Sequence, residues 1–114
     1  MKLGEMVNVY GVLGEAKMST LKVEEVLKAV KARKAMRPHV EEWNAFFKDI
    51  QEKAQSWETM TDEQRAEINK AVNEESQREV EVSFEKFTEE SIANLIQENG
   101  FKVREIDLLD IMME

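Results

Sequence analysis

The sequence predicts a mainly α-helical domain of the α+β class, with one long kinked central helix and a small two-stranded β element near the C-terminus. Three observations support this prediction. Apolar residues recur at intervals of three and four over most of the chain, which is the period of an amphipathic helix. Only four Gly and one Pro interrupt the 114 residues. The period changes to two in a single stretch, from Val80 to Glu85, as in a strand.

A first helix is expected over residues 3–13, where five apolar residues share one helical face. These residues are Leu3, Met6, Val7, Tyr10 and Leu13. Gly14 should end this helix, because glycine is common just past a helix C-terminus. Ser19 or Thr20 is expected to cap the next helix, since a hydroxyl oxygen can accept from the free amides of a first turn.

The main predicted element is a helix over residues 21–57, about 55 Å long at roughly 1.5 Å per residue. Two apolar runs line it: Val23, Val26, Leu27 and Val30, then Val40, Trp43, Phe47, Ile50, Ala54 and Trp57. Pro38 lies between the runs and lacks the amide for an interior hydrogen bond. Because the two runs stay roughly in phase, we expect a kink at Pro38 instead of a break. Such a helix is longer than a compact domain of this size is wide, so part of it must project or pack on another chain.

A third helix and a strand are expected next. Thr61 and Gln64 match the Thr-x-x-Gln pattern of a capping box and should begin a weakly amphipathic helix. Val80, Val82 and Phe84 then alternate with polar residues, as a half-buried strand requires.

The last thirty residues are expected to contain two short helices and the second strand. Thr88 should cap a helix that ends at Asn99 and Gly100. Residues 101–106 are predicted to form the strand that completes the two-stranded element. Residues 107–114 are predicted to form a short helix at the end of the chain.

Length and composition set the class of protein. At 114 residues we expect one domain that spans residues 1–114. Apolar residues make up 42% and charged residues 35%, which is typical of a helix-rich globular protein. The absence of Cys excludes disulfides, thiolate catalysis and Cys-based metal sites. With no signal-like start and no long apolar run, a cytoplasmic location without a membrane span is expected.

The charge of the chain is divided by position. Residues 1–40 carry eight Lys or Arg and four Asp or Glu, a net charge of +4, and residues 41–114 carry eight and twenty, a net charge of −12. Opposite charges attract over helix-packing distances, so the two parts either complement each other or face different partners. A basic patch lies in the first part, at Lys28, Lys31, Arg33, Lys34 and Arg37. We interpret it as solvated or docked on the acidic part; nucleic-acid binding is a weaker alternative, because the overall charge of −8 repels nucleic acid.

No motif predicts an enzyme. His39 is the single histidine, and its nearest carboxylates, Glu41 and Glu42, are neighbours on the same predicted helix. Adjacent residues on a helix point about 100° apart, so their carboxylates do not converge on a substrate or cation. The sequence has no phosphate-binding Gly loop, EF-hand loop or His-Glu-x-x-His motif. We therefore expect no catalytic residues, no cofactor and no bound metal.

The densest aromatic group supplies the candidate interaction residues, which are Trp43, Phe46, Phe47, Ile50 and Trp57. At helical spacing such a group is usually part of a core. Phe46 lies off the line of Trp43 and Phe47, however, so the apolar surface is wider than one neighbouring helix covers. Large aromatic residues supply much of the binding energy at the centre of an interface. The leading specific hypothesis is therefore self-association into a homo-oligomer through residues 40–57.

The chain opens with Met1-Lys2-Leu3-Gly4-Glu5 and continues with Asn8-Val9-Tyr10-Gly11-Val12-Leu13-Gly14. Ala35 and Pro38 then precede Val40-Glu41-Glu42 in a long charged segment. In these features the first half of the chain resembles small acidic proteins of unknown function that phages and prophages encode. The resemblance implies a structural or assembly accessory role, with a virion-associated location, and it carries no catalytic residues.

A second hypothesis comes from the acidic part of the chain. Residues 41–114 could act as an acidic inhibitor or an antitoxin-like protein that occupies a basic site on an enzyme or nucleic-acid-binding partner. Electrostatic attraction would speed such binding and would make it sensitive to salt.

Overall fold

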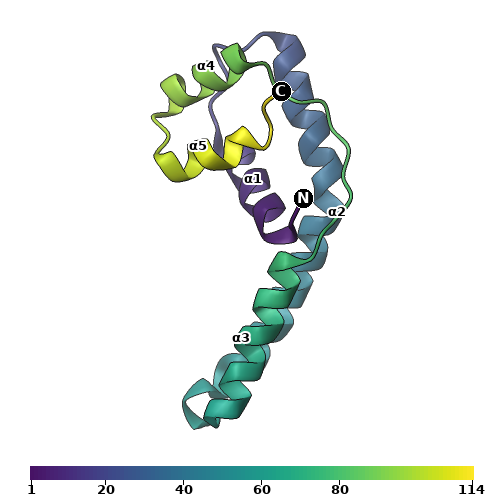
Figure 1. The fold of residues 1–114 in the computed structure, drawn as a ribbon, viewed down its shortest axis with the longest axis vertical. Coiled ribbons are helices and arrows are strands. Elements are labelled where there is room, and N and C mark those ends of the chain that lie inside the picture. The colour runs from purple at the N-terminus through teal and green to yellow at the C-terminus, as the bar shows by residue number, and fades with distance from the viewer.

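A helical head and a projecting helical hairpin make up the molecule (Figure 1). The computed structural model describes residues 1–114. Its elements are α1 (Leu3–Glu15), α2 (Val23–Lys53), the 3-10 helix η1 (Ala54–Thr59), α3 (Asp62–Gln77), α4 (Glu89–Asn99) and α5 (Val103–Asp110). The molecule measures 53 × 27 × 19 Å, because α2 runs through both the head and the hairpin. Part of the long helix therefore projects, as its length predicts.

The prediction of a mainly α-helical fold is confirmed, whereas the predicted two-stranded element is wrong. Residues 101–106 form no strand, because α5 begins at Val103 within them. Ile106 and Leu109 are three residues apart, which is a helical spacing, and Leu109 is fully buried in the core. The prediction placed residues up to 106 in a strand and the following residues in a helix, so the two residues of this helical pattern were assigned to different elements.

The other expected strand is an extended segment, residues 79–87, which we call the strap. It runs along α2 from the end of α3 to the start of α4 (Figure 1). Isolated bridges, Lys2 to Glu79 and Phe87 to Met113, are its only β pairings. Its side chains alternate as predicted from residue 79 to 85: Val80, Val82 and Phe84 belong to or pack against the core, and Glu79, Glu81, Ser83 and Glu85 are largely solvent-facing. The alternation ends at Lys86, which is also exposed, before the buried Phe87. The alternation arises because one face of the strap packs on the helices. No second strand is needed to explain it.

The hydrophobic core lies in the head, around α1, which packs on α2, α3 and α5. Fourteen buried apolar residues form one cluster: Leu3, Met6, Val9, Leu13, Ala29, Ala32, Met36, Val40, Val80, Phe87, Ile92, Leu95, Leu109 and Met112. No residue from 41 to 79 is buried. The hairpin made by the outer half of α2, η1 and α3 therefore lies outside the core, and we call residues 41–77 the stem.

In its first half, α2 does not bury the predicted face. Val23, Leu27 and Val30 are exposed by 74, 50 and 56%. The buried positions of α2 are Glu25, Ala29, Ala32, Met36 and Val40. Val30 and Val40 lie about 80° apart around a helix of roughly 100° per residue, so the two predicted runs are not in phase. The small alanines on the buried face let α1 pack closely on α2.

Both ends of α2 differ from the prediction: the α-helix begins at Val23 and ends at Lys53, where the 3-10 helix η1 follows. α2 continues through Pro38 as one helix, in agreement with the expectation of no break. Its N-cap is Lys22, which makes no side-chain capping bond. Ser19 and Thr20 instead donate their amides and hydroxyls to the carboxylate of Glu98, at the end of α4. The Ser19 hydroxyl, with Thr20 and the two amides, holds the pKa of Glu98 below its usual value.

Two glycines give opposite predictions for substitution by alanine. Gly100 ends α4 with a φ of +59°, where a Cβ is strained, so Gly100→Ala should cost about 1 kcal/mol of stability. Gly11 lies inside α1, and a Cβ there would meet no atom within 4 Å. Gly11→Ala should therefore raise stability by about 0.5–1 kcal/mol. Urea unfolding of both variants measures the two effects, and a loss at Gly11 or a gain at Gly100 would contradict the assigned backbone conformations.

Candidate functional site

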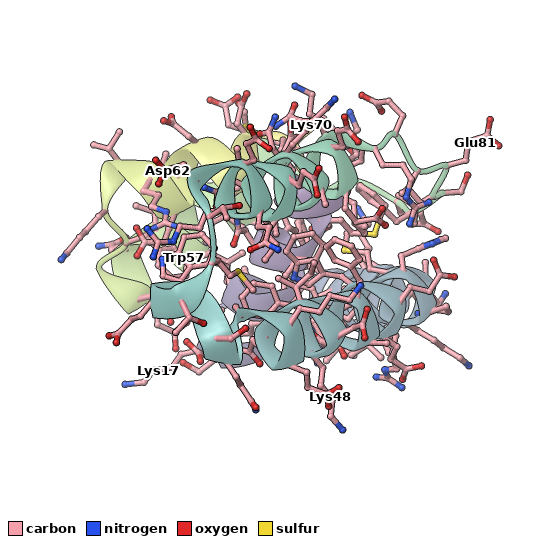
Figure 2. The ribbon with its side chains drawn as sticks, turned by 90° about the horizontal axis from the view of Figure 1, so that it is seen from below. Lys17, Lys48, Trp57, Asp62, Lys70 and Glu81 are labelled. Carbon is pink, nitrogen blue, oxygen red and sulfur yellow. The ribbon has the colours of Figure 1, made fainter.

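The tip of the stem is closed by local hydrogen bonds. Thr61 Oγ1 accepts from the Gln64 amide at 3.2 Å, and Gln64 Oε1 accepts from the Thr61 amide at 3.0 Å, which confirms the predicted capping box. Arg65 donates to the carbonyls of Trp57 and Glu58 at 2.8 and 3.0 Å. Its guanidinium carbon lies 5.6 Å from the centroid of the Trp57 ring. Trp57 is therefore a residue of the tip, beside the turn into α3 (Figure 2).

An aromatic cluster lies nearer to the head. The ring centroid of Trp43 is 5.8 Å from that of Phe46 and 6.0 Å from that of Phe47. Trp43 packs against the core of the head, whereas Phe47 is 40% exposed. Ile50 follows on the next turn of α2 and is half-buried. The predicted interaction residues thus extend along the whole stem, with Trp43 at the head and Trp57 at the tip.

An open groove of about 420 Å³ lies along the stem between α2 and α3. Its apolar lining is Ile50, Met60, Ile68 and Ala71. In a pair of helices, each helix covers only one side of the other. No third element of the chain lines this groove. The stem can therefore accept another helix or hairpin through apolar contacts.

The chain matches no protein-family model, no curated protein and no solved structure. The candidate site is therefore defined by the geometry of the chain itself. No three His, Asp or Glu side chains are grouped so that they could hold a metal ion. None of the helices combines the length and apolar character needed to cross a membrane.

The residues of the predicted basic patch do not share one surface. The guanidinium carbon of Arg33 lies 4.0 Å from the Tyr10 ring centroid, and Arg33 Nε donates to the Tyr10 carbonyl at 3.3 Å. Arg37 donates to the Tyr10 hydroxyl at 3.4 Å. These two arginines therefore pack α2 against α1. Lys31 and Lys34 are exposed and make no ion pair within the chain.

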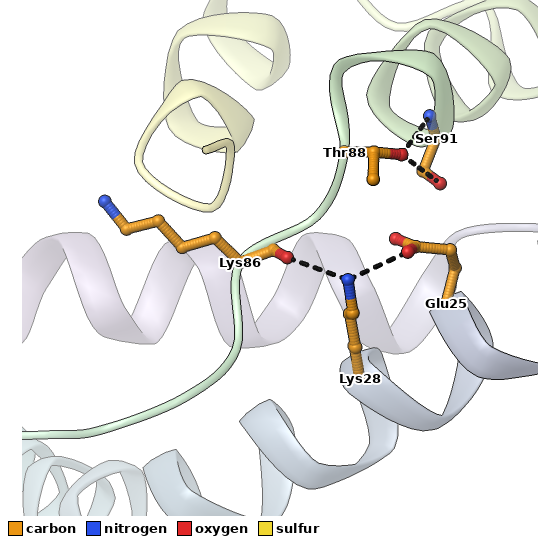
Figure 3. A network of polar contacts seen from close by, with 5 residues as sticks. All are labelled: Glu25, Lys28, Lys86, Thr88 and Ser91. Atoms are coloured by element: carbon orange, nitrogen blue, oxygen red, sulfur yellow. Dashed lines mark hydrogen bonds and ion pairs between the residues drawn. The ribbon is translucent and has the colours of Figure 1, made fainter.

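Lys28, the remaining residue of the patch, belongs to a polar network between α2 and the start of α4 (Figure 3). Its Nζ lies 2.9 Å from Oε1 of Glu25 and donates to the Lys86 carbonyl at 3.2 Å. Glu25 is the single buried acid, with 6% exposure. Burial by itself raises the pKa of Glu25, but Lys28, the Ser91 hydroxyl and the Thr88 backbone outweigh it, so this pKa lies below its ordinary value of 4.5.

Glu25 is a residue that the sequence analysis did not single out. The spacing of the second apolar run nevertheless indicates that Glu25 lies on the buried face of α2. Continued toward the N-terminus from Val40, that spacing passes through Met36, Ala32 and Ala29 and reaches Glu25 on the same face. A charged residue on a buried face requires a partner, which Lys28 supplies one turn later.

Proposed function

We propose that this chain is a non-enzymatic protein–protein interaction module that self-associates through its stem, with Phe46, Phe47 and Ile50 in the interface. The observation that supports this proposal is that no residue from 41 to 79 is buried, although the segment contains four large aromatic side chains, of which Phe47 is exposed and the other three are half-buried. A second stem packed beside the first would cover these residues. The two hairpins would then form a four-helix arrangement with helices crossing at about 20°.

The charge of the stem predicts how salt affects this association. Residues 41–77 carry ten Asp or Glu and four Lys or Arg, a net charge of −6. Two stems of like charge repel each other. At an ionic strength of roughly 0.1 M, salt largely screens the repulsion between charges that are more than about 10 Å apart. Self-association through apolar contacts should therefore strengthen as salt is added. An acidic inhibitor bound to a basic partner, which is the alternative function, would show the opposite dependence.

The proposed biological role is a structural or assembly accessory of a phage or prophage. The resemblance of the first half of the chain to small phage-encoded proteins supports this role, and so does a stem that extends away from the head (Figure 1). In such an assembly the stems would join copies to one another. The heads would remain free to contact other components.

Replacing Phe47 with glutamate tests the interface. Phe47 is already 40% exposed, so Phe47→Glu should leave the head folded and should weaken association by about 2 kcal/mol or more, roughly 30-fold in the dissociation constant. Size exclusion with light scattering should show a lower mass for this variant than for the parent. Val103→Glu is the matched control, because Val103 is 72% exposed but lies on α5 in the head. An unchanged mass for Phe47→Glu, or an equal loss for both variants, would refute the interface.

A further inference from the structure

The middle of the strap has an unpaired backbone. At its two ends, the Val80 amide donates to the Met1 carbonyl at 2.9 Å, and the Phe87 amide donates to the Met112 carbonyl at 2.7 Å. Between them, no amide of residues 81–86 donates to any group of the chain, and the only carbonyl that accepts is that of Lys86, from Lys28. A run of free amides and carbonyls on an extended segment is a sheet edge that lacks its neighbouring strand.

This edge is held in place before any partner arrives. The first residues of the chain pair with the start of the strap and the last residues pair with its end. Val82 and Phe84 pack against the core between these two points. The strap is already extended and anchored, so little free energy of binding would be spent on ordering it.

The solvent-facing side chains of the strap are acidic. Glu79 pairs with the N-terminal ammonium group at 3.2 Å, whereas Glu81 and Glu85 are exposed and make no ion pair. In Figure 2, Glu81 points away from the helices into solvent. An open hollow of about 620 Å³ lies beside the strap and is lined by Met1 and residues 79–83. The unpaired backbone therefore lies beside an open hollow and beside two unpaired carboxylates.

A second copy of the strap would not be a favourable neighbour. If two straps paired antiparallel about Ser83 with their apolar faces on the same side, Glu81 of one would lie opposite Glu85 of the other. Like charges directly opposite each other destabilise a strand pair. A strand with Lys or Arg at these positions would instead be attracted to both acids.

We propose that the strap binds an extended basic segment of a partner protein by β-strand addition. The backbone of the segment pairs with residues 81–86, and its Lys or Arg side chains, at alternate positions, face Glu81 and Glu85. Apolar side chains between them lie on the side of Val82 and Phe84. This surface lies on the head and is separate from the stem, so it does not depend on self-association.

Hydrogen exchange with a synthetic peptide tests the proposal. The probe is an eight-residue peptide of alternating Lys and Val with blocked ends, added to the full chain. An added strand bonds to one edge, and successive residues of a strand point to opposite edges. The exchange of every second amide from 81 to 86 should therefore slow by about tenfold or more. No slowing, or equal slowing at all six amides, would overturn the proposal.

Two controls separate strand addition from simple attraction between charges. In the first, two further peptides carry N-methyl groups at either all Val or all Lys amides, which removes donors but keeps the charge. One of the two should lose binding in calorimetry; if both bind as the parent peptide does, strand addition is wrong. In the second, Glu81→Lys/Glu85→Lys should weaken binding about tenfold, whereas Glu52→Lys/Glu58→Lys, the same charge change on the stem, should not. Equal weakening by both pairs would also refute the site.

Discussion

Replacing Phe87 with alanine is expected to lower the free energy of unfolding by about 3–5 kcal/mol. Phe87 is fully buried, and its backbone bonds to Met112 and Glu114, so its ring lies where the strap, the C-terminal tail and the core meet. Removal of the ring loses its transfer free energy and leaves a cavity. Because hydrogen bonds hold the backbone on both sides, the site can collapse little to fill that cavity. Urea unfolding followed by circular dichroism measures the loss.

Phe47→Ala is the matched control for this experiment. The same atoms are removed, but Phe47 is 40% exposed and lies on the stem, outside the core. At a protein concentration low enough for the chain to be monomeric, its loss should be no more than about 1 kcal/mol. Equal losses for the two variants would contradict the assignment of the core to the head.

Glu25→Gln is expected to lower the free energy of unfolding by about 1–3 kcal/mol. The substitution keeps the size of the side chain but removes the charge that Lys28 pairs with at 2.9 Å. It thereby loosens Lys28, which also joins α2 to the strap by donating to the Lys86 carbonyl (Figure 3). Glu24→Gln, at an exposed neighbouring position, should change stability by less than about 0.5 kcal/mol. A loss for Glu24→Gln as large as that for Glu25→Gln would exclude a specific role for the buried pair.

The same residue predicts a dependence of stability on pH. The pKa of Glu25 is lower in the folded chain than its ordinary value of 4.5. Its stabilising contribution is therefore complete above pH 4.5 and is lost as the pH falls below 4.5 and through the folded-state pKa. The parent should lose stability over this acid range more steeply than Glu25→Gln does. Identical pH profiles for the two chains would show that the Glu25 carboxylate does not contribute through its charge.

The parts of the fold that the sequence predicted well are those fixed by neighbouring residues. The capping box of Thr61 and Gln64 and the cap at Thr88 each involve residues three positions apart. Gly100 ends α4 through its own backbone conformation. Such signals are complete within one turn of chain when no distant side chain competes for the capping group. At Ser19 and Thr20 the carboxylate of Glu98 does compete, and the predicted cap of α2 does not form.

The parts that failed depend on contacts between distant segments. The exposed face of α2 carries Val23, Leu27 and Val30, which are more apolar than the alanines it buries, so hydrophobicity alone pointed to the wrong side. Close packing of α1 on the small residues decides which face is buried. The alternation in the strap likewise showed that one face is buried, but it could not show whether a second strand pairs with it.

The candidate site was also only partly predictable. Trp43, Phe46 and Phe47 were found from their spacing and do lie in contact. Which of these rings is covered depends, however, on contacts with distant segments that no local pattern encodes: Trp43 and Phe46 are half-buried, whereas Phe47 is 40% exposed. The free backbone of residues 81–86 could not be found from side chains at all, because it is defined by the hydrogen bonds that the rest of the chain does not make.

The solution mass of the unmodified chain tests self-association through the stem most directly. Light scattering coupled to size exclusion would be recorded over a range of protein concentrations, at low and at high salt. The apolar interface between two acidic stems predicts a mass of at least two chains, with dissociation on dilution becoming weaker as salt is added. A single-chain mass at every concentration and at both salt levels would contradict it.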